Sequence, residues 1–256
     1  MSKTKVAIVN YLNTKPFLHG LEQQRFQDAF EIIECAPAAC AELFFDRKAD
    51  ISLVPVGALT NQEFTLLNRY GIASNGKVSS VCLFSDVPVE EIENVYLDYQ
   101  SRTSVLLIQI LFKQFWKREV VYLDSEPDYE AKITKSTGGL IIGDRAIRGK
   151  SNYKYAYDLG ECWQKLTGLP FVYAVWLSNE NIDPLRMDLF NQAISNGIET
   201  KQEIINSIEG YPIDLNIYFN ENIQYVIEDS YLEGMQLFLK FARELENSVI
   251  PIPSFF

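Results

Sequence analysis

The chain has 256 residues, of which 47% are hydrophobic and 22% are charged, and its formal net charge is −11 at pH 7. This length and composition suit one large or two modest domains with real cores. The acidic balance argues against a nucleic-acid binder, which normally presents a basic surface. No run approaches the roughly 20 apolar residues of a membrane-spanning helix. The first residues, MSKTKVAIVNYLNTKP, contain no signal-peptide core, so we expect a cytoplasmic protein without a membrane partner.

The cysteines and the histidine do not form a recognisable site. Cys35, Cys40, Cys82 and Cys162 are scattered without a CxxC pair, and His19 is the only histidine. This set has the spacing of neither a zinc site nor a disulfide framework. We interpret the four cysteines as buried free thiols and His19, inside a helical stretch, as a structural or surface residue. No metal site is expected.

The first part of the chain alternates between strands and helices. Three short apolar runs are predicted as strands: 5–9 (KVAIV), 30–35 (FEIIEC) and 50–57 (DISLVPVG). This alternation predicts a mainly parallel sheet. Open α/β proteins bind ligands in the loops at the carboxyl ends of such strands. The loop that holds Asn13 and Thr14, and the turn at Pro55, are therefore candidate binding segments.

Residues 95–116 predict a strand, a polar elbow and an apolar helix. Ser101 or Thr103 is a natural N-cap, and the apolar residues that follow recur at roughly helical spacing. A helix that opens with Ser101, Arg102, Thr103 and Ser104 offers N–H groups, hydroxyls and a guanidinium at its positive end, which together form a cradle for a carboxylate or phosphate. An ordinary capped helix with a surface arginine uses the same residue types, so the elbow alone leaves both interpretations open.

Two extended stretches, 78–85 and 171–177, are the natural places for the chain to cross between two lobes and return. We therefore expect a first lobe of residues 1–84 plus 175–256 and an inserted second lobe of residues 85–174. A cleft between them would gather polar residues from several strand ends, as hinge-closing binding folds do. Its predicted lining is Asn13, Thr14, Pro55, Ser79, Ser80, the elbow Ser101 to Ser104, Gly143 and Asp144.

Several motifs also carry a resemblance to a known family. They are YLNTKP (11–16), DISLVPV (50–56), SRTSV (101–105), IIGDRA (141–146), DLGE (158–161), and Trp163 followed by TGLPFVYAVW (167–176). In this order and with this spacing they resemble the chorismate dehydratase family of the futalosine pathway of menaquinone biosynthesis. The likeness runs from the first strand to about Trp176. The last 80 residues add only a helical pattern.

The resemblance implies an α/β fold of two lobes, the periplasmic-binding-protein-like type II fold. It also implies a lyase that works without a metal or an organic cofactor. The expected reaction is the loss of water from chorismate to give 3-[(1-carboxyvinyl)oxy]benzoate, with chorismate as the small anionic partner. The oligomeric state and the extent of hinge closure stay open.

The resemblance places Asn13 at the catalytic asparagine of the family. We hypothesise that Asn13 positions the substrate and polarises its leaving hydroxyl or a carboxylate, while the enolpyruvyl carboxylate of the substrate takes the proton. Asp144 is either a helix N-cap or a catalytic proton acceptor in the cleft. The elbow from Ser101 suits one substrate carboxylate; Ser79 and Ser80, or the Asn13 loop, suit the other.

Two other functions remain open at this point. A 1,4-dihydroxy-6-naphthoate synthase of the same pathway would share the fold, but we expect it to need a basic residue in the second lobe, whereas His19 lies in the first. A non-catalytic binding protein for a small carboxylate would use the same cleft. Receptors of that kind are exported, and the lack of a secretion signal counts against this alternative.

Overall fold

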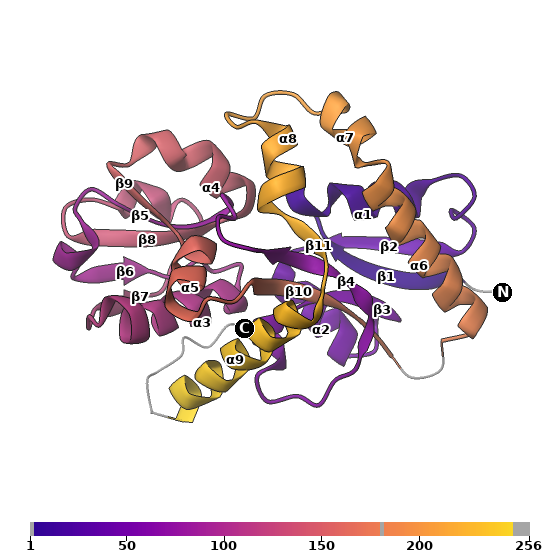
Figure 1. Cartoon of the computed structure of the whole chain (residues 1–256), viewed down its shortest axis with the longest axis horizontal. Coiled ribbons are helices and arrows are strands. Elements are labelled where there is room, and N and C mark those ends of the chain that lie inside the picture. Colours follow the sequence, from indigo (N-terminus) through magenta and orange to yellow (C-terminus); the bar gives the residue numbers. More distant parts are fainter. Residues whose placement is uncertain (1–2, 180–181, 248–256) are drawn as a thin grey trace.

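The computed structural model describes residues 3–179 and 182–247, which form two β-sheets flanked by helices (Figure 1). In these residues the first sheet has the order β11-β4-β10-β3-β1-β2, formed by Gln224–Val226, Leu66–Ser74, Phe171–Ser178, Ile51–Pro55, Thr4–Val9 and Phe30–Cys35. The second has the order β7-β6-β8-β5-β9, formed by Val121–Leu123, Asn94–Tyr96, Thr137–Ile142, Val81–Ser85 and Tyr155–Asp158. The expected two-lobed α/β fold is confirmed.

Both sheets are mixed. In the first sheet β1 pairs in parallel with β2 and β3, while β10 runs antiparallel to β3 and β4. In the second sheet β6 pairs in parallel with β7 and β8, while β5 runs antiparallel to β8 and β9. The expectation of mainly parallel sheets therefore holds for one half of each. The antiparallel half arises because β5 and β10 enter their sheets from the other sheet instead of through a βαβ crossover.

The chain passes between the sheets twice. It leaves the first sheet after β4 and enters the second at β5, and it returns from α5 (Leu159–Thr167) to β10. The passages are residues 75–80 and 168–170, and the two extended stretches 78–85 and 171–177 form mainly the strands that follow them, β5 and β10. The expected lobe boundaries, at 84/85 and 174/175, remain a prediction; by pairing, β5 belongs to the second sheet and β10 to the first.

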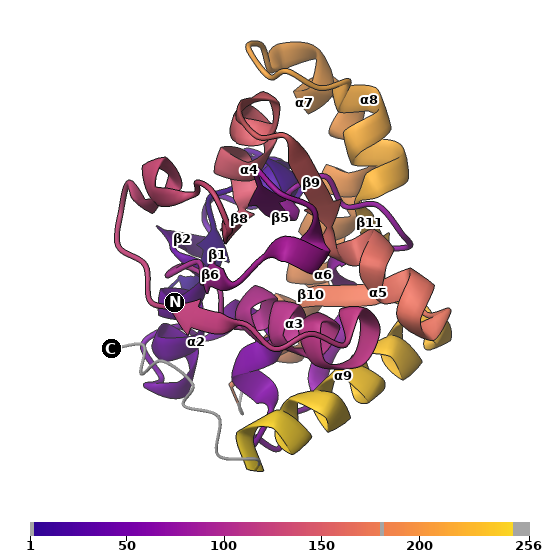
Figure 2. The ribbon, with the colours of Figure 1, turned by 90° about the vertical axis from the view of Figure 1, so that its left-hand side faces the viewer.

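The helices cover the sheets as Figures 1 and 2 show. Beside the first sheet lie α1 (Lys15–Glu22), α2 (Pro37–Phe45), α6 (Pro184–Glu199), α7 (Lys201–Ser207) and α8 (Leu215–Ile217). With the second sheet lie α3 (Arg102–Leu111), α4 (Gly143–Gly149) and α5. The last helix, α9 (Asp229–Asn247), contacts both β10 and α3, so it joins the two halves along one side. Across residues 3–179 and 182–247, each helix is too short or too polar to span a lipid bilayer.

Two glycines let α1 pack directly against α6. A Cβ added to Gly20 would lie 2.0 Å from the carbonyl oxygen of Ala193, and one added to Gly197 would lie 2.0 Å from that of Pro16. The two backbones are therefore in contact, which no larger residue permits. This contact fixes α1, and α1 in turn holds the loop that ends in Asn13 and Thr14 at the carboxyl end of β1.

Replacing Gly197 by alanine is expected to lower the free energy of unfolding by about 1–3 kcal/mol, because the added methyl group must push α1 away from α6. Urea denaturation measures this change. Gly149→Ala, at the end of α4, is the control: its Cβ would meet only a ring carbon of Tyr153 at 3.9 Å, so this variant should be as stable as the original protein or slightly more stable. Equal effects of the two substitutions would contradict the packing argument.

Candidate functional site

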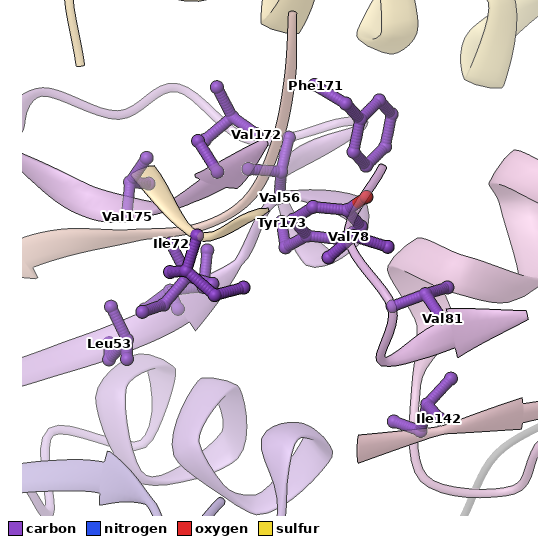
Figure 3. Packing of buried hydrophobic residues seen from close by; sticks show 14 of the residues in the cluster. Leu53, Val56, Ile72, Val78, Val81, Ile142, Phe171, Val172, Tyr173 and Val175 are labelled. Carbon is purple, nitrogen blue, oxygen red and sulfur yellow. The ribbon is translucent and has the colours of Figure 1, made fainter. Parts of the chain in front are cut away.

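A cavity that is open on one side lies between the two sheets. Its apolar wall comes from both of them: Figure 3 shows Leu53 and Ile72 on one side, and Val81 and Ile142 on the other, with Val78 between. Its polar lining consists of Tyr11, Asn13, Thr14, Ser80, Ser101, Thr103, Ser104 and Tyr173. No Asp, Glu, His, Lys or Arg is among the described residues that line it.

The structure brings most of the predicted site residues to this cavity. The following line it: Asn13, Thr14, Pro55, Ser80, Ser101, Thr103, Ser104 and Gly143. Ser79, Arg102 and Asp144 lie outside this lining, and each has another partner. The Ser79 hydroxyl donates to Asn222 Oδ1 (2.9 Å), and Arg102 pairs with Glu246 (2.8 Å). The guanidinium that the sequence suggested for the cradle is therefore engaged elsewhere.

The elbow before α3 forms a set of neutral donors. Ser101 is the N-cap: its Oγ accepts from Ser104 N at 3.2 Å and donates to Ser104 Oγ at 2.9 Å. The Ser104 hydroxyl proton thus remains available for another acceptor. The first backbone hydrogen bond of the helix runs from Val105 N to Ser101 O. The N–H groups of Arg102 and Thr103 come earlier in the chain, at the positive end of the helix, and take no part in its backbone bonding. This end suits a carboxylate.

The loop after β1 presents Asn13 from a single 3-10 turn (Leu12–Thr14). Tyr225 OH donates to the backbone oxygen of Asn13 at 2.9 Å, and Thr14 Oγ1 bonds to the backbone oxygen of Tyr11 at 2.8 Å. The Asn13 side-chain oxygen is buried, and within the described residues it has no hydrogen-bond partner. Buried polar atoms normally have partners, so this amide is set to meet a ligand or water.

Asp158 holds the crossover segment that carries Ser80 into the cavity. Its carboxylate accepts from Val78 N (3.1 Å) and Ser79 N (2.7 Å), and also from two N–H groups in the first turn of α5. Ser79 has φ +64°, so this support maintains a backbone conformation that costs a serine free energy. Burial raises the pKa of Asp158 above its ordinary value, against the lowering effect of the N–H donors.

Asp144 joins the two halves of the molecule. Its carboxylate accepts from Leu12 N (3.0 Å) and from Tyr211 OH (2.7 Å), both on the side of the first sheet. The Arg148 guanidinium stacks over the Tyr211 ring at 4.3 Å. Asp144 lies in the first turn of α4, whose N-cap position is Ile142. Asp144 therefore does not take the N-cap place that the sequence offered as one alternative.

A partly buried polar network adjoins the cavity at Tyr11, and no pattern in the sequence indicates it. Tyr11 OH donates to Gln100 Oε1 (2.7 Å), and Arg145 Nη2 contacts the same oxygen (3.1 Å) and Asp98 Oδ2 (2.6 Å). Burial raises the pKa of Tyr11 and of Asp98. The phenol of Tyr11 thus stays protonated and tethers the first half to the second. Asp98 and Gln100 lie between β6 and α3, just before Ser101, but only long-range contacts reveal this role.

Asp158→Asn is expected to lower the free energy of unfolding by about 1–3 kcal/mol, because an amide nitrogen would then face N–H donors that need an acceptor. Asp214→Asn is the matched control. Asp214 caps the short helix α8 by accepting from two N–H groups at its solvent-exposed start, and asparagine is an equally good N-cap. Urea denaturation of both variants measures the difference. If Asp158→Asn lowers the free energy of unfolding no more than Asp214→Asn does, Asp158 does not anchor the crossover segment.

Comparisons with known proteins place these features in context. A family model described as menaquinone biosynthesis matches residues 4–244. Among curated proteins, the chain is 26% identical to a chorismate dehydratase of Thermus thermophilus, over 91% of this chain and 93% of that protein.

Solved structures share the fold at low identity. Protein AF1704 from Archaeoglobus fulgidus has a TM-score of 0.73 at 12% identity, covering 96% of this chain and 98% of its own. The alkanesulfonate-binding protein SsuA of Xanthomonas axonopodis pv. citri, bound to MOPS, has a TM-score of 0.61 at 12% identity, over 98% and 95% of the two chains. The CA3427 gene product of Candida albicans, described as having the generic periplasmic binding protein fold, has a TM-score of 0.61 at 11% identity, over 99% and 92%. With a family model that spans nearly the whole sequence, the chain belongs to the menaquinone biosynthesis family.

Proposed function

We propose that the protein is a chorismate dehydratase, a lyase that removes water from chorismate to give 3-[(1-carboxyvinyl)oxy]benzoate. Membership of the menaquinone biosynthesis family and the likeness to the Thermus thermophilus chorismate dehydratase support the substrate. The observation that carries the proposal is the cavity between the sheets, which neutral donors line together with Asn13, whose buried side-chain oxygen has no partner among the described residues. Such a site suits a small ring with carboxylate groups.

The reaction needs little chemistry from the protein. A proton leaves the ring carbon that bears the enolpyruvyl ether, hydroxide leaves the neighbouring carbon, and the two combine as water while the ring becomes aromatic. Aromatisation drives this step, so orientation and a route for the proton are the main requirements. A cavity lined by fixed donors can supply both.

The two substrate carboxylates would be held by opposite walls of the cavity. The start of α3, with the Ser104 hydroxyl at its positive end, suits one of them. Ser80 and Asn13 line the cavity and are the proposed contacts for the other carboxylate or for the leaving hydroxyl. We assign no direct contact to Ser79, since its hydroxyl already donates to Asn222.

The proton acceptor is proposed to be the substrate itself. Among the described lining residues there is no carboxylate or imidazole. Asp144 is bonded to Leu12 N and Tyr211 OH, which suits a structural role in closing the site better than that of a base. The enolpyruvyl carboxylate lies close to the departing proton by its own covalent geometry. Asn13 would then position that group and polarise the hydroxyl that leaves.

Incubation of the purified protein with chorismate and EDTA, followed by mass spectrometry, tests the function. We expect a product lighter than chorismate by one water, which forms with active protein and not with heat-inactivated protein. If chorismate stabilises the protein against heat but is never converted, the protein is a binding protein and the proposal is wrong. Unchanged chorismate without any stabilisation would also overturn it, and would turn attention to later intermediates of the same pathway.

Asn13→Ala is expected to reduce kcat by about 10²-fold with a much smaller change in KM, as the loss of one fixed polar group at a developing charge does. Asn10→Ala is the matched control, because Asn10 lies three residues earlier, is exposed and does not line the cavity. That variant should keep its turnover. Steady-state kinetics of both variants measure kcat and KM. A kcat of Asn13→Ala close to that of the original protein would show that Asn13 has no catalytic role.

A further inference from the structure

Two of the four cysteines face each other beside the cavity. The sulfur atoms of Cys35 and Cys40 lie 2.9 Å apart, both as free thiols. Cys35 ends the edge strand β2, and Cys40 lies in the second turn of α2. A disulfide needs a sulfur–sulfur distance of about 2.0 Å, so the two atoms must approach by only about 0.9 Å.

The surroundings give the two thiols different characters. Cys40 is fully buried, whereas Cys35 is only partly covered at the edge of the sheet. The hydrogen bond from the Cys40 thiol lowers the pKa of Cys35, and the same bond together with burial raises the pKa of Cys40. Cys35 is therefore the more accessible and the more easily ionised of the two, as an attacking thiol must be. Cys40 lies within reach behind it.

We propose that Cys35 and Cys40 form a reversible disulfide when the protein meets a hydroperoxide. The Cys35 thiol ionises and its thiolate attacks the OH oxygen of the hydroperoxide, so that the O–O bond breaks and Cys35 becomes a sulfenic acid. The hydroxide or alkoxide that leaves takes up the proton released by the thiol and becomes water or an alcohol. The Cys40 sulfur then attacks the Cys35 sulfur and displaces hydroxide, which takes the Cys40 proton and leaves as water. The two sulfurs lose two electrons and the peroxide gains them.

The bond would close a short loop next to the candidate site. Pro37, between the two cysteines, lines the cavity, and Cys40 packs in one cluster with Val9 and Tyr11, which also line it. The disulfide would thus fix one part of the cavity wall without occupying the cavity. The inference does not depend on the proposed function, because it follows from the two thiols alone.

The remaining cysteines provide an internal control. Cys82 in β5 is 2% exposed and Cys162 in α5 is 7% exposed. Burial raises the pKa of the Cys162 thiol to about 12 and that of the Cys82 thiol well above its ordinary value. Such thiols react slowly with peroxides, since the thiolate is the reactive form. Oxidation of the folded protein should therefore be confined to the pair.

The test is to treat the folded, reduced protein with hydrogen peroxide, block the remaining thiols, and map the peptides by mass spectrometry with and without a reductant. We expect the peptide that carries Cys35 and Cys40 to lose the mass of two hydrogen atoms and to regain it on reduction. Cys82 and Cys162 should not be oxidised and should carry the blocking group. Oxidation of Cys35 to a sulfinic acid without the internal bond, or equal oxidation of all four cysteines, would overturn the proposal.

Two variants separate the roles within the pair. In Cys40→Ser, Cys35 should form a sulfenic acid that a dimedone reagent captures, because no second thiol resolves it. In Cys35→Ser, Cys40 should remain unmodified, because it is buried. Capture of dimedone to the same extent in the original protein as in Cys40→Ser would mean that Cys40 does not complete the bond. The mapping of the original protein decides the proposal even if a variant folds poorly.

Discussion

The candidate site depends on the closure of two sheets over a cavity. Four hydrogen bonds among the described residues help to hold the halves together: those from Leu12 N and Tyr211 OH to the Asp144 carboxylate, from Tyr11 OH to Gln100, and from Gly57 N to Thr103 Oγ1 (2.9 Å). At Gly57 a Cβ would lie 2.7 Å from the Thr103 backbone, so the backbones are in contact there. Because these contacts cross the cavity rim, they set its size and the positions of its donors.

The electrostatics of this cavity follow from the positions of the charged groups around it. The lining donors in the described residues are neutral, while charged groups such as Asp98 and Arg145 lie behind the wall and neutralise each other at 2.6 Å. A dianionic ligand would meet hydroxyls, an amide and the positive end of α3 without competing against an internal carboxylate. Since the chain as a whole carries a net charge of −11, attraction of such a ligand has to come from this local arrangement.

The sequence predicted features that local patterns determine. The strands 5–9 and 30–35 and the helix capped by Ser101 appear close to their expected bounds, because apolar periodicity and capping residues act within a few positions. The sequence did not predict the start of strand β4 at Leu66, nor strand β9. Both strands are specified by pairing with distant segments. Likewise the partners of Asp144 and Tyr11 lie on the opposite half of the molecule, and no spacing in the chain indicates them.

The most direct test of this account is a crystal structure of the protein with 3-[(1-carboxyvinyl)oxy]benzoate, the proposed product, which dehydration cannot consume. The account predicts the ligand in the cavity between the sheets, with one carboxylate on the Ser104 hydroxyl at the start of α3, and with the Asn13 amide in hydrogen-bond contact with the ligand. The interlobe contact of Asp144 with Leu12 and Tyr211 should be present. Binding at another place, or in the cavity with no contact to Asn13 or Ser104, would contradict it.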